Sequence, residues 1–243
     1  EAFDHCTSLP SITLPKSLCE LGDKAFYSCN ALAEITLPDS LATVGVNPFL
    51  SCQKLSAIHV SPAHPTLSAE GCVLMDQMQK RLICYPCTLT QTSYTLPEDT
   101  LIIDAQAFEG TQVQTVVLPE GLTTIGIRAF AECTNLLEIT IPSTVNAVGD
   151  SAFIQCPVLT TANILNRVMS AAQFYECRSL QTVRLSPQLK TIPPFCFYGC
   201  GALTSAVLPE GLLHVGSCSF YYCSALPEIN LPDGLLFIGN GAF

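Results

Sequence analysis

The sequence predicts a β-rich solenoid, a rod built by stacking short coils of chain, and two observations lead to this prediction. Ten of the twelve phenylalanines share one position of a repeating unit. They are Phe3, Phe26, Phe49, Phe108, Phe130, Phe153, Phe174, Phe197, Phe220 and Phe243. Most steps between them are 23 residues, two are 22 and 21, and one is 59. A short fixed period is typical of folds in which each coil buries its apolar side chains against the next.

The first element of each unit is predicted to be a short strand. In the unit from Cys29 to Cys52, Ile35 and Leu37 alternate with outward positions, which is the period of a strand with one buried face. Pro38 follows and has no amide donor, so it should end the strand and begin a corner. At about 4.8 Å per coil, ten such coils would form a rod of roughly 50 Å.

The next feature is a glycine four residues before phenylalanine, present in six of nine complete units. The six are Gly22, Gly45, Gly126, Gly149, Gly216 and Gly239. The other three units have Asp104, Ser170 and Pro193 at this position. Because glycine and aspartate tolerate positive φ, we expect a tight bend here.

Residues 61–95 interrupt the period and are predicted to form one elongated coil. Within it, the apolar runs Cys72–Met75 and Leu82–Tyr85 flank the polar turn Asp76–Arg81, a pattern typical of a β-hairpin. The regular unit resumes at Leu96. We therefore expect a single repeat domain over 1–243, with this hairpin coil as an insert, cut from a longer chain because both ends fall inside a repeat.

Composition and charge exclude several classes of function. Only 12% of residues are charged, against about 25% in a typical soluble protein, and the net charge is −10 with a pI near 4.7. The ten lysines and arginines are scattered, so no basic stripe is available for nucleic acid. No apolar run approaches the 18 residues of a membrane span, so we expect no membrane insertion by this segment.

The repeat pattern C-x2-L-x2-I-x-L-P-x2-L-x2-I-G-x2-A-F resembles the BspA-like bacterial surface leucine-rich repeat family. Residues 64–65, 70–74 and 82–86 are similar to the long variant coil of that family. The resemblance covers essentially the whole chain. It implies a right-handed leucine-rich repeat superhelix of short strands, turns and short 3-10 segments. It also implies a secreted or cell-surface protein that adheres to host proteins or other cells.

Eight of the fourteen cysteines occupy one position, three residues after phenylalanine. They are Cys6, Cys29, Cys52, Cys133, Cys156, Cys177, Cys200 and Cys223. We expect a buried ladder of reduced thiols, because free cysteine is a small, commonly buried side chain and parallel Cβ vectors are poorly directed for a disulfide. In the unit of Phe108 we place Gly110 at the cysteine position.

Other reactive residues give weak signals. Cys84 and Cys87 have the spacing of a redox motif, but they end a predicted hairpin strand and precede no helix, so a structural role is favoured, with a local disulfide or a metal contact left open. His59 and His64 have no second metal-like pair nearby, which favours a turn or surface role. No nucleophile elbow, phosphate loop or dinucleotide motif is present. We therefore expect no catalytic, cofactor-binding or metal site.

The candidate ligand face is the outward position between the two buried residues of each predicted strand. It holds Thr13, Thr36, His59, Val117, Thr140, Asn163, Arg184, Val207 and Asn230. Side by side these would form a wide, weakly charged sheet, and repeat proteins commonly bind through such extended faces. Threonine is also common in strands that bind nothing, which leaves an ordinary surface as the alternative.

The sequence thus favours a non-enzymatic surface or secreted repeat module that binds protein or glycan, such as a host-surface or matrix protein, through this face. The hairpin coil could assist binding. One alternative is a passive spacer that presents another domain away from the cell. The least favoured is a redox enzyme that uses Cys84 and Cys87.

Overall fold

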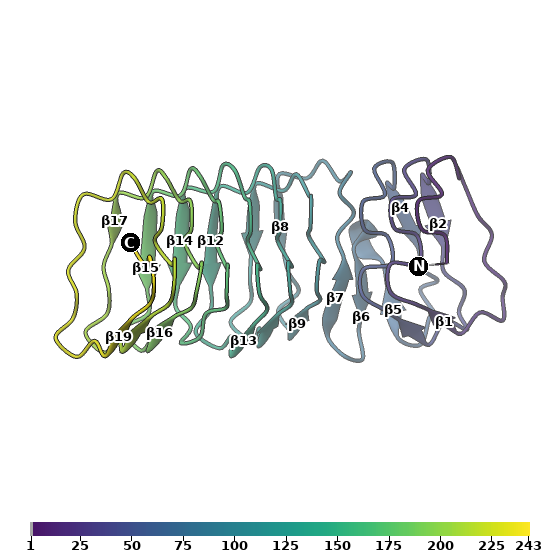
Figure 1. Ribbon diagram of the computed structural model, residues 1–243. Coiled ribbons are helices and arrows are strands. Elements are labelled where there is room, and N and C mark those ends of the chain that lie inside the picture. Colours follow the sequence, from purple (N-terminus) through teal and green to yellow (C-terminus); the bar gives the residue numbers. More distant parts are fainter. Residues whose placement is uncertain (1) are drawn as a thin grey trace.

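The structure is a computed structural model that describes residues 2–243, and it is a solenoid of stacked coils (Figure 1). Nineteen short strands and one 3-10 turn, η1 (Glu70–Cys72), make up its regular elements over the described residues. The two termini lie toward opposite ends of the stack. The predicted β-rich solenoid is confirmed.

The first strand of each coil builds one side of the rod, with parallel pairing between neighbouring coils. These strands are β2 (Glu34–Thr36), β4 (Ala57–His59), β8 (Ser93–Thr95), β10 (Thr115–Val117), β12 (Glu138–Ile141), β14 (Thr161–Ile164), β15 (Thr182–Leu185) and β17 (Ser205–Ala206). Strands β2 and β4 pair only with each other, whereas β8, β10, β12, β14, β15 and β17 form a six-stranded sheet. The sheet on this side is therefore divided between β4 and β8.

A second side is built from shorter strands. They are β1 (Glu20–Leu21), β3 (Thr43–Val44), β9 (Ile102–Ile103), β11 (Thr124–Ile125), β13 (Ala147–Val148), β16 (Thr191–Ile192), β18 (His214–Val215) and β19 (Phe237–Ile238). On this side β1 pairs with β3, and β16, β18 and β19 form a three-stranded sheet. Strands β13, β11 and β9 continue through β7 into the hairpin coil.

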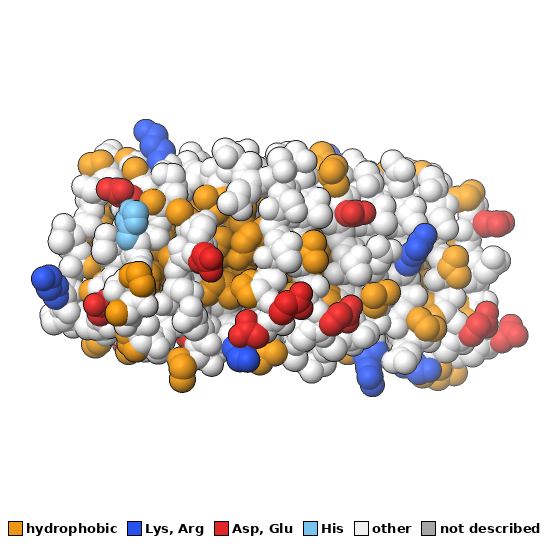
Figure 2. All heavy atoms as spheres, turned by 180° about the vertical axis from the view of Figure 1, so that it is seen from behind, with side chains coloured by type: hydrophobic (Ala, Val, Ile, Leu, Met, Phe, Trp, Pro, Cys, Tyr) orange, Lys and Arg blue, Asp and Glu red, His pale blue; other side chains and the backbone are white. Residues whose placement is uncertain are grey.

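The hairpin coil contains β5 (Leu67–Ser68), β6 (Leu74–Asp76) and β7 (Arg81–Cys84). Strands β6 and β7 pair antiparallel, with Asp76 opposite Arg81, and β7 then pairs parallel with β9. The predicted hairpin is confirmed. It also separates the hydrophobic core into two clusters, because Ile83 and Cys84 pack with the coils before it whereas Leu82 and Tyr85 pack with those after it. Figure 2, which views the molecule from behind, shows hydrophobic side chains gathered in one patch near this level of the stack.

The phenylalanine column forms the interior spine. Successive rings from Phe108 to Phe243 stack with centroids 4.7–5.6 Å apart, and Phe3, Phe26 and Phe49 stack at 4.9 and 5.8 Å. In the hairpin coil Tyr85 takes the phenylalanine position, which the repeat pattern did not predict. Its ring stacks on Phe108 at 5.0 Å, and its N–H donates to the Ala107 carbonyl at 2.8 Å, the same bond that Phe108 makes to Ala129.

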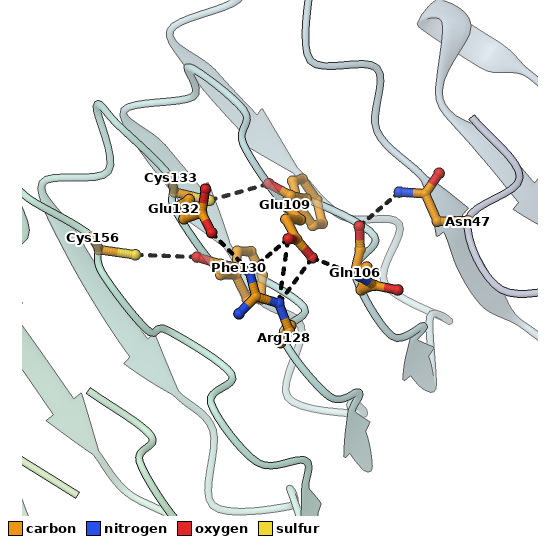
Figure 3. A network of polar contacts seen from close by, with 9 residues as sticks. Asn47, Gln106, Glu109, Arg128, Phe130, Glu132, Cys133 and Cys156 are labelled. Carbon is orange, nitrogen blue, oxygen red and sulfur yellow. Dashed lines mark hydrogen bonds and ion pairs between the residues drawn. The ribbon is translucent and has the colours of Figure 1, made fainter. Parts of the chain in front are cut away.

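The cysteine column satisfies the carbonyl groups of this spine. The Phe174 carbonyl accepts the Cys177 N–H within its own coil and the Cys200 thiol of the next coil, both at 3.2 Å. Figure 3 shows the equivalent thiol contact from Cys156 to the Phe130 carbonyl. Both acceptor sites of such a carbonyl are therefore used. All fourteen cysteines are free, and the ladder is buried except at its ends, where Cys6 is exposed and Cys223 half-buried.

Two of the sequence expectations are wrong. The residue at the cysteine position of the fourth regular unit is Thr111, not Gly110: its N–H donates to the Phe108 carbonyl and its hydroxyl lies 3.4 Å from the Cys133 thiol. The glycine column does not adopt positive φ. A Cβ at Gly149 would lie 2.2 Å from the Ile127 nitrogen, so glycine is needed because the preceding coil passes so close.

In the regular coils the left-handed residues instead lie two positions before and two positions after phenylalanine, as at Arg128 and Glu132 around Phe130. The N–H groups of these two residues and of the phenylalanine between them donate to carbonyl groups of the following coil, which are those of Asp150, Ala152 and Ile154. Non-glycine residues adopt this backbone at a cost of about 1–2 kcal/mol each. The inter-coil hydrogen bonds offset that cost and make a third ladder along the rod.

Candidate functional site

The candidate ligand face lies on the side of the rod that carries β2, β4 and the six-stranded sheet. Its strands alternate exposed and buried side chains, as in β2, where Ile35 is buried between exposed Glu34 and Thr36. Eight of the nine candidate side chains are exposed, and Asn163 is half-buried. Strand pairing aligns these positions: Thr36 lies opposite His59, and Asn163 lies between Thr140 and Arg184.

Neighbouring side chains on this face contact one another. The Asn163 amide donates to the Thr140 hydroxyl at 3.1 Å, and His59 Nε2 lies 3.5 Å from a Glu34 carboxylate oxygen. Threonine hydroxyls, amides and one guanidinium thus offer donors and acceptors in rows about 4.8 Å apart. Such a surface suits a ligand that runs along the rod and makes many small polar contacts.

Two grooves cut into the two ends of this face. The N-terminal groove, about 760 Å³, is lined by Thr13, Thr36 and His59 together with the corner residues that follow them. The C-terminal groove, about 540 Å³, is lined by Val207 and Asn230 and by the carboxylates of Glu210, Glu228 and Asp233. The structure therefore brings five of the nine candidates into grooves. Val117, Thr140, Asn163 and Arg184 lie on the flatter surface between them.

A tenth member of the face, Thr95, was not predicted from the sequence. It lies in β8 opposite Val117, and it precedes Leu96-Pro97 as Thr36 precedes Leu37-Pro38. The Leu-Pro step is the sequence signal for this position, but the 23-residue period that predicts the other members fails in the hairpin coil. Thr95 also lines a third groove of about 560 Å³, between β8 and the hairpin, with Met75 and Tyr94 among its other lining residues.

Polar side chains tie the coils on either side of the hairpin together. Arg81 donates to an Asp104 carboxylate oxygen and to the Val44 carbonyl, both at 2.7 Å, so it reaches the coil before the hairpin and the coil after it. Asp76 lies 3.6 Å from the same guanidinium. Burial raises the pKa of Asp104 to about 6, against the opposing attraction of Arg81.

A second bridge spans the same gap. The Asn47 amide donates to the Gln106 carbonyl at 2.7 Å, across 59 residues of sequence (Figure 3). Gln106 also donates to Glu109, whose carboxylate accepts from Arg128 at 2.6 Å. These side chains pair with one another within the rod, so we assign them to holding neighbouring coils together and not to ligand binding.

The remaining candidates for chemistry are explained by packing. Cys84 is buried, and desolvation raises its pKa well above the usual value, which disfavours the thiolate that redox chemistry requires. His64 is buried, and its Nδ1 accepts the N–H groups of Thr66 and Leu67 in a turn. Over residues 2–243, no group of three or more metal-ligating side chains has the geometry of a metal site.

No helix in the described part of the chain has the length and apolar character that a membrane crossing needs.

No curated protein matches the chain. Solved structures do: a leucine-rich repeat protein from Eubacterium ventriosum is 28% identical, with a TM-score of 0.90 over 96% of this chain and 63% of that one.

Two further structures share the fold at lower identity. A leucine rich cell surface protein from Faecalibacterium prausnitzii is 24% identical, with a TM-score of 0.66 over 94% of this chain and 55% of that one. A leucine-rich repeat protein from Bacteroides ovatus is 23% identical, with a TM-score of 0.59 over 98% and 70%. The chain spans less than two thirds of the first two proteins.

Six copies of the BspA type leucine rich repeat region match residues 1–73, 83–173 and 167–243. These matches leave out only part of the hairpin coil, where the period is interrupted. In this chain the matched residues carry the phenylalanine spine, the cysteine ladder and the parallel strands described above. The chain therefore belongs to the BspA-type leucine-rich repeat family.

Proposed function

We propose that this chain is a non-enzymatic binding module of a bacterial cell-surface or secreted protein, and that it binds a protein or glycan through its strand face. The observation that carries the proposal is the N-terminal groove, where three side chains singled out by the repeat pattern, Thr13, Thr36 and His59, line one cavity of about 760 Å³. A groove of this size accommodates several residues of an extended ligand.

The chemistry of the face also supports binding. Its outward side chains are mostly hydroxyls and amides, so affinity would come from many short-range contacts instead of from charge steering, and it should depend weakly on salt. The buried, deprotonation-resistant thiols and the absence of a catalytic motif in the sequence favour binding over catalysis.

Binding can be tested by passing the purified chain over immobilised matrix proteins and glycans, and by comparing paired variants. Replacing Thr36 with arginine in the N-terminal groove, or Arg184 with glutamate on the flat face, should lower the affinity for a true partner at least tenfold. Thr191→Arg, at the exposed residue of strand β16 on the other side, is the matched control and should leave affinity unchanged.

Two results would count against the proposal. If all three variants bind equally, the strand face is not the binding surface. If no partner binds this chain but a partner binds a longer form of the protein, the repeats act as a spacer that presents another domain.

A further inference from the structure

A second surface, outside the strand face, lies at the turn that follows the phenylalanine column near the C-terminal end. Here Tyr175, Tyr198 and Tyr221 each follow a spine phenylalanine directly. Their rings stack along the rod, with centroids 4.7 Å apart between Tyr175 and Tyr198 and 5.6 Å apart between Tyr198 and Tyr221. Tyr222 lies across this stack at 88° to Tyr198, and 64% of its surface is exposed.

A groove of about 330 Å³ forms beside these rings because three neighbouring coils carry different residues at the same two positions. Two residues after phenylalanine the coils have Glu176, Gly199 and Tyr222; four residues after it they have Arg178, Gly201 and Ser224. The middle coil thus has no side chain where its neighbours have one. The Glu176 N–H donates to the Tyr198 carbonyl at 2.7 Å, and the Gly199 N–H donates to the Tyr221 carbonyl at 2.8 Å. These hydrogen bonds hold the three coils of the groove side by side.

The two walls of this groove, which we name the edge groove, differ in chemistry. One wall is the aromatic ring of Tyr222, held in place by its edge contacts with Tyr198 and Tyr221. The other is the pair formed by the Arg178 guanidinium and the Glu176 carboxylate, 3.2 Å apart. The two walls stand on coils two spacings apart, roughly 10 Å from backbone to backbone. The Glu176 side chain lies over Gly199, with its Cγ 3.2 Å from where a Cβ would be, so the open space of the groove lies over Gly201 and beside the Tyr222 ring.

We propose that the edge groove binds a pyranose ring of a neutral glycan. A sugar ring presents an apolar C–H face that packs on an aromatic ring, and its edge carries adjacent hydroxyls that need both a donor and an acceptor. Tyr222 supplies the aromatic ring, and the Arg178–Glu176 pair supplies the donor and the acceptor. A phosphate or an acidic sugar would meet the Glu176 carboxylate and the net charge of −10. The site is separate from the strand face and independent of the function proposed for it.

The proposal can be tested by affinity electrophoresis of the chain in gels that contain soluble mixed-linkage β-glucan, arabinoxylan or galactomannan. We expect at least one of these neutral polysaccharides to retard the protein. Tyr222→Ala should weaken that binding at least tenfold, whereas Tyr222→Phe should retain it. Tyr27→Ala, which removes the tyrosine of the corresponding turn near the other end of the rod, is the control.

A second pair of variants blocks the groove without removing a contact. Gly201 has ordinary φ, and a Cβ there would meet nothing closer than 3.7 Å, so Gly201→Leu should fill the groove, abolish retardation and leave the melting temperature unchanged. Gly121→Leu, at a similarly open and exposed glycine, should bind as the wild type does. The proposal is overturned if no neutral polysaccharide retards the protein, if only an acidic one does, or if Gly201→Leu still binds.

Discussion

At the scale of single residues, Tyr85 has a ring that fits the phenylalanine spine but a hydroxyl that does not. Tyr85 replaces phenylalanine in the hairpin coil and keeps the stacking of the column. Its hydroxyl, however, is buried and has no hydrogen-bond partner among the described residues. A buried hydroxyl without a partner costs about 1–3 kcal/mol.

We therefore predict that Tyr85→Phe stabilises the protein by about 1 kcal/mol, because the ring contacts remain and the unsatisfied hydroxyl is removed. Urea unfolding followed by circular dichroism would measure the change. Tyr94→Phe, whose ring packs against Tyr85 in a half-buried position, is the comparison and should change stability less. A destabilised Tyr85→Phe would mean that the hydroxyl has a partner in solution.

At the scale of the repeated element, the glycine column is set by the distance between coils rather than by backbone conformation. Gly126 and Gly149 approach the backbone of the preceding coil so closely that even a methyl group would overlap it. The neighbour here is main chain, which cannot rotate away as a side chain could. The left-handed positions beside phenylalanine, by contrast, hold many side-chain types, and of the residues there Arg128 is half-buried and Glu132 is exposed.

Substitution of Gly149 by alanine is thus predicted to destabilise the rod by on the order of 3 kcal/mol, since the coils must separate to admit the Cβ. Gly121→Ala should fall within about 1 kcal/mol of the wild type, because its Cβ would meet only the Glu98 carbonyl, at an ordinary 3.6 Å. Thermal unfolding of the two variants side by side provides the measurement. Equal melting temperatures would contradict the close-contact explanation.

At the scale of the whole molecule, the hairpin coil is the joint at which the stack is divided. It divides the strand face between β4 and β8 and separates the core into two clusters. Arg81 and Asn47 bridge the division with buried polar contacts. In a repeat array stability is a sum of neighbouring interfaces, so this joint sets how strongly the first coils are coupled to the rest.

The joint is predicted to loosen as pH rises. Burial raises the pKa of Asp104 to about 6 in the folded state, above its usual value of 3.8, so folding favours the protonated acid. That stability is fully present below about pH 4 and is lost as pH rises through 6. Hydrogen exchange of β1–β4 should accelerate over this range, relative to β10–β15, beyond the intrinsic pH effect on exchange.

The Asp104→Asn variant separates this titration from other effects. Asparagine can still accept from Arg81 but does not ionise, so the pH dependence of the joint should flatten between pH 4 and 7. If the variant retains the full dependence, another group is responsible.

The solenoid, the hairpin and the interior columns could be predicted from the sequence, because a recurring period brings equivalent residues of successive coils together. Strand β2 ends before Leu37-Pro38, Phe26 stacks on Phe3 and Phe49, and the Cys29 thiol donates to the Phe3 carbonyl. Each of these features follows from the position of the residue in the repeat. The outward stripe on the strands follows from the same alternation. Even the missed Thr95 carried the Leu-Pro signal.

Features that depend on distances between coils, or across the hairpin coil, could not be predicted and required the three-dimensional structure. It showed that Gly149 is required by a neighbouring backbone, that Tyr85 completes the spine, and that Arg81 joins two cores. It also showed the grooves, including the one that Gly199 and Gly201 open between Glu176 and Tyr222. A period states which residues are equivalent, but the space between them depends on how the side chains of adjacent coils fill it.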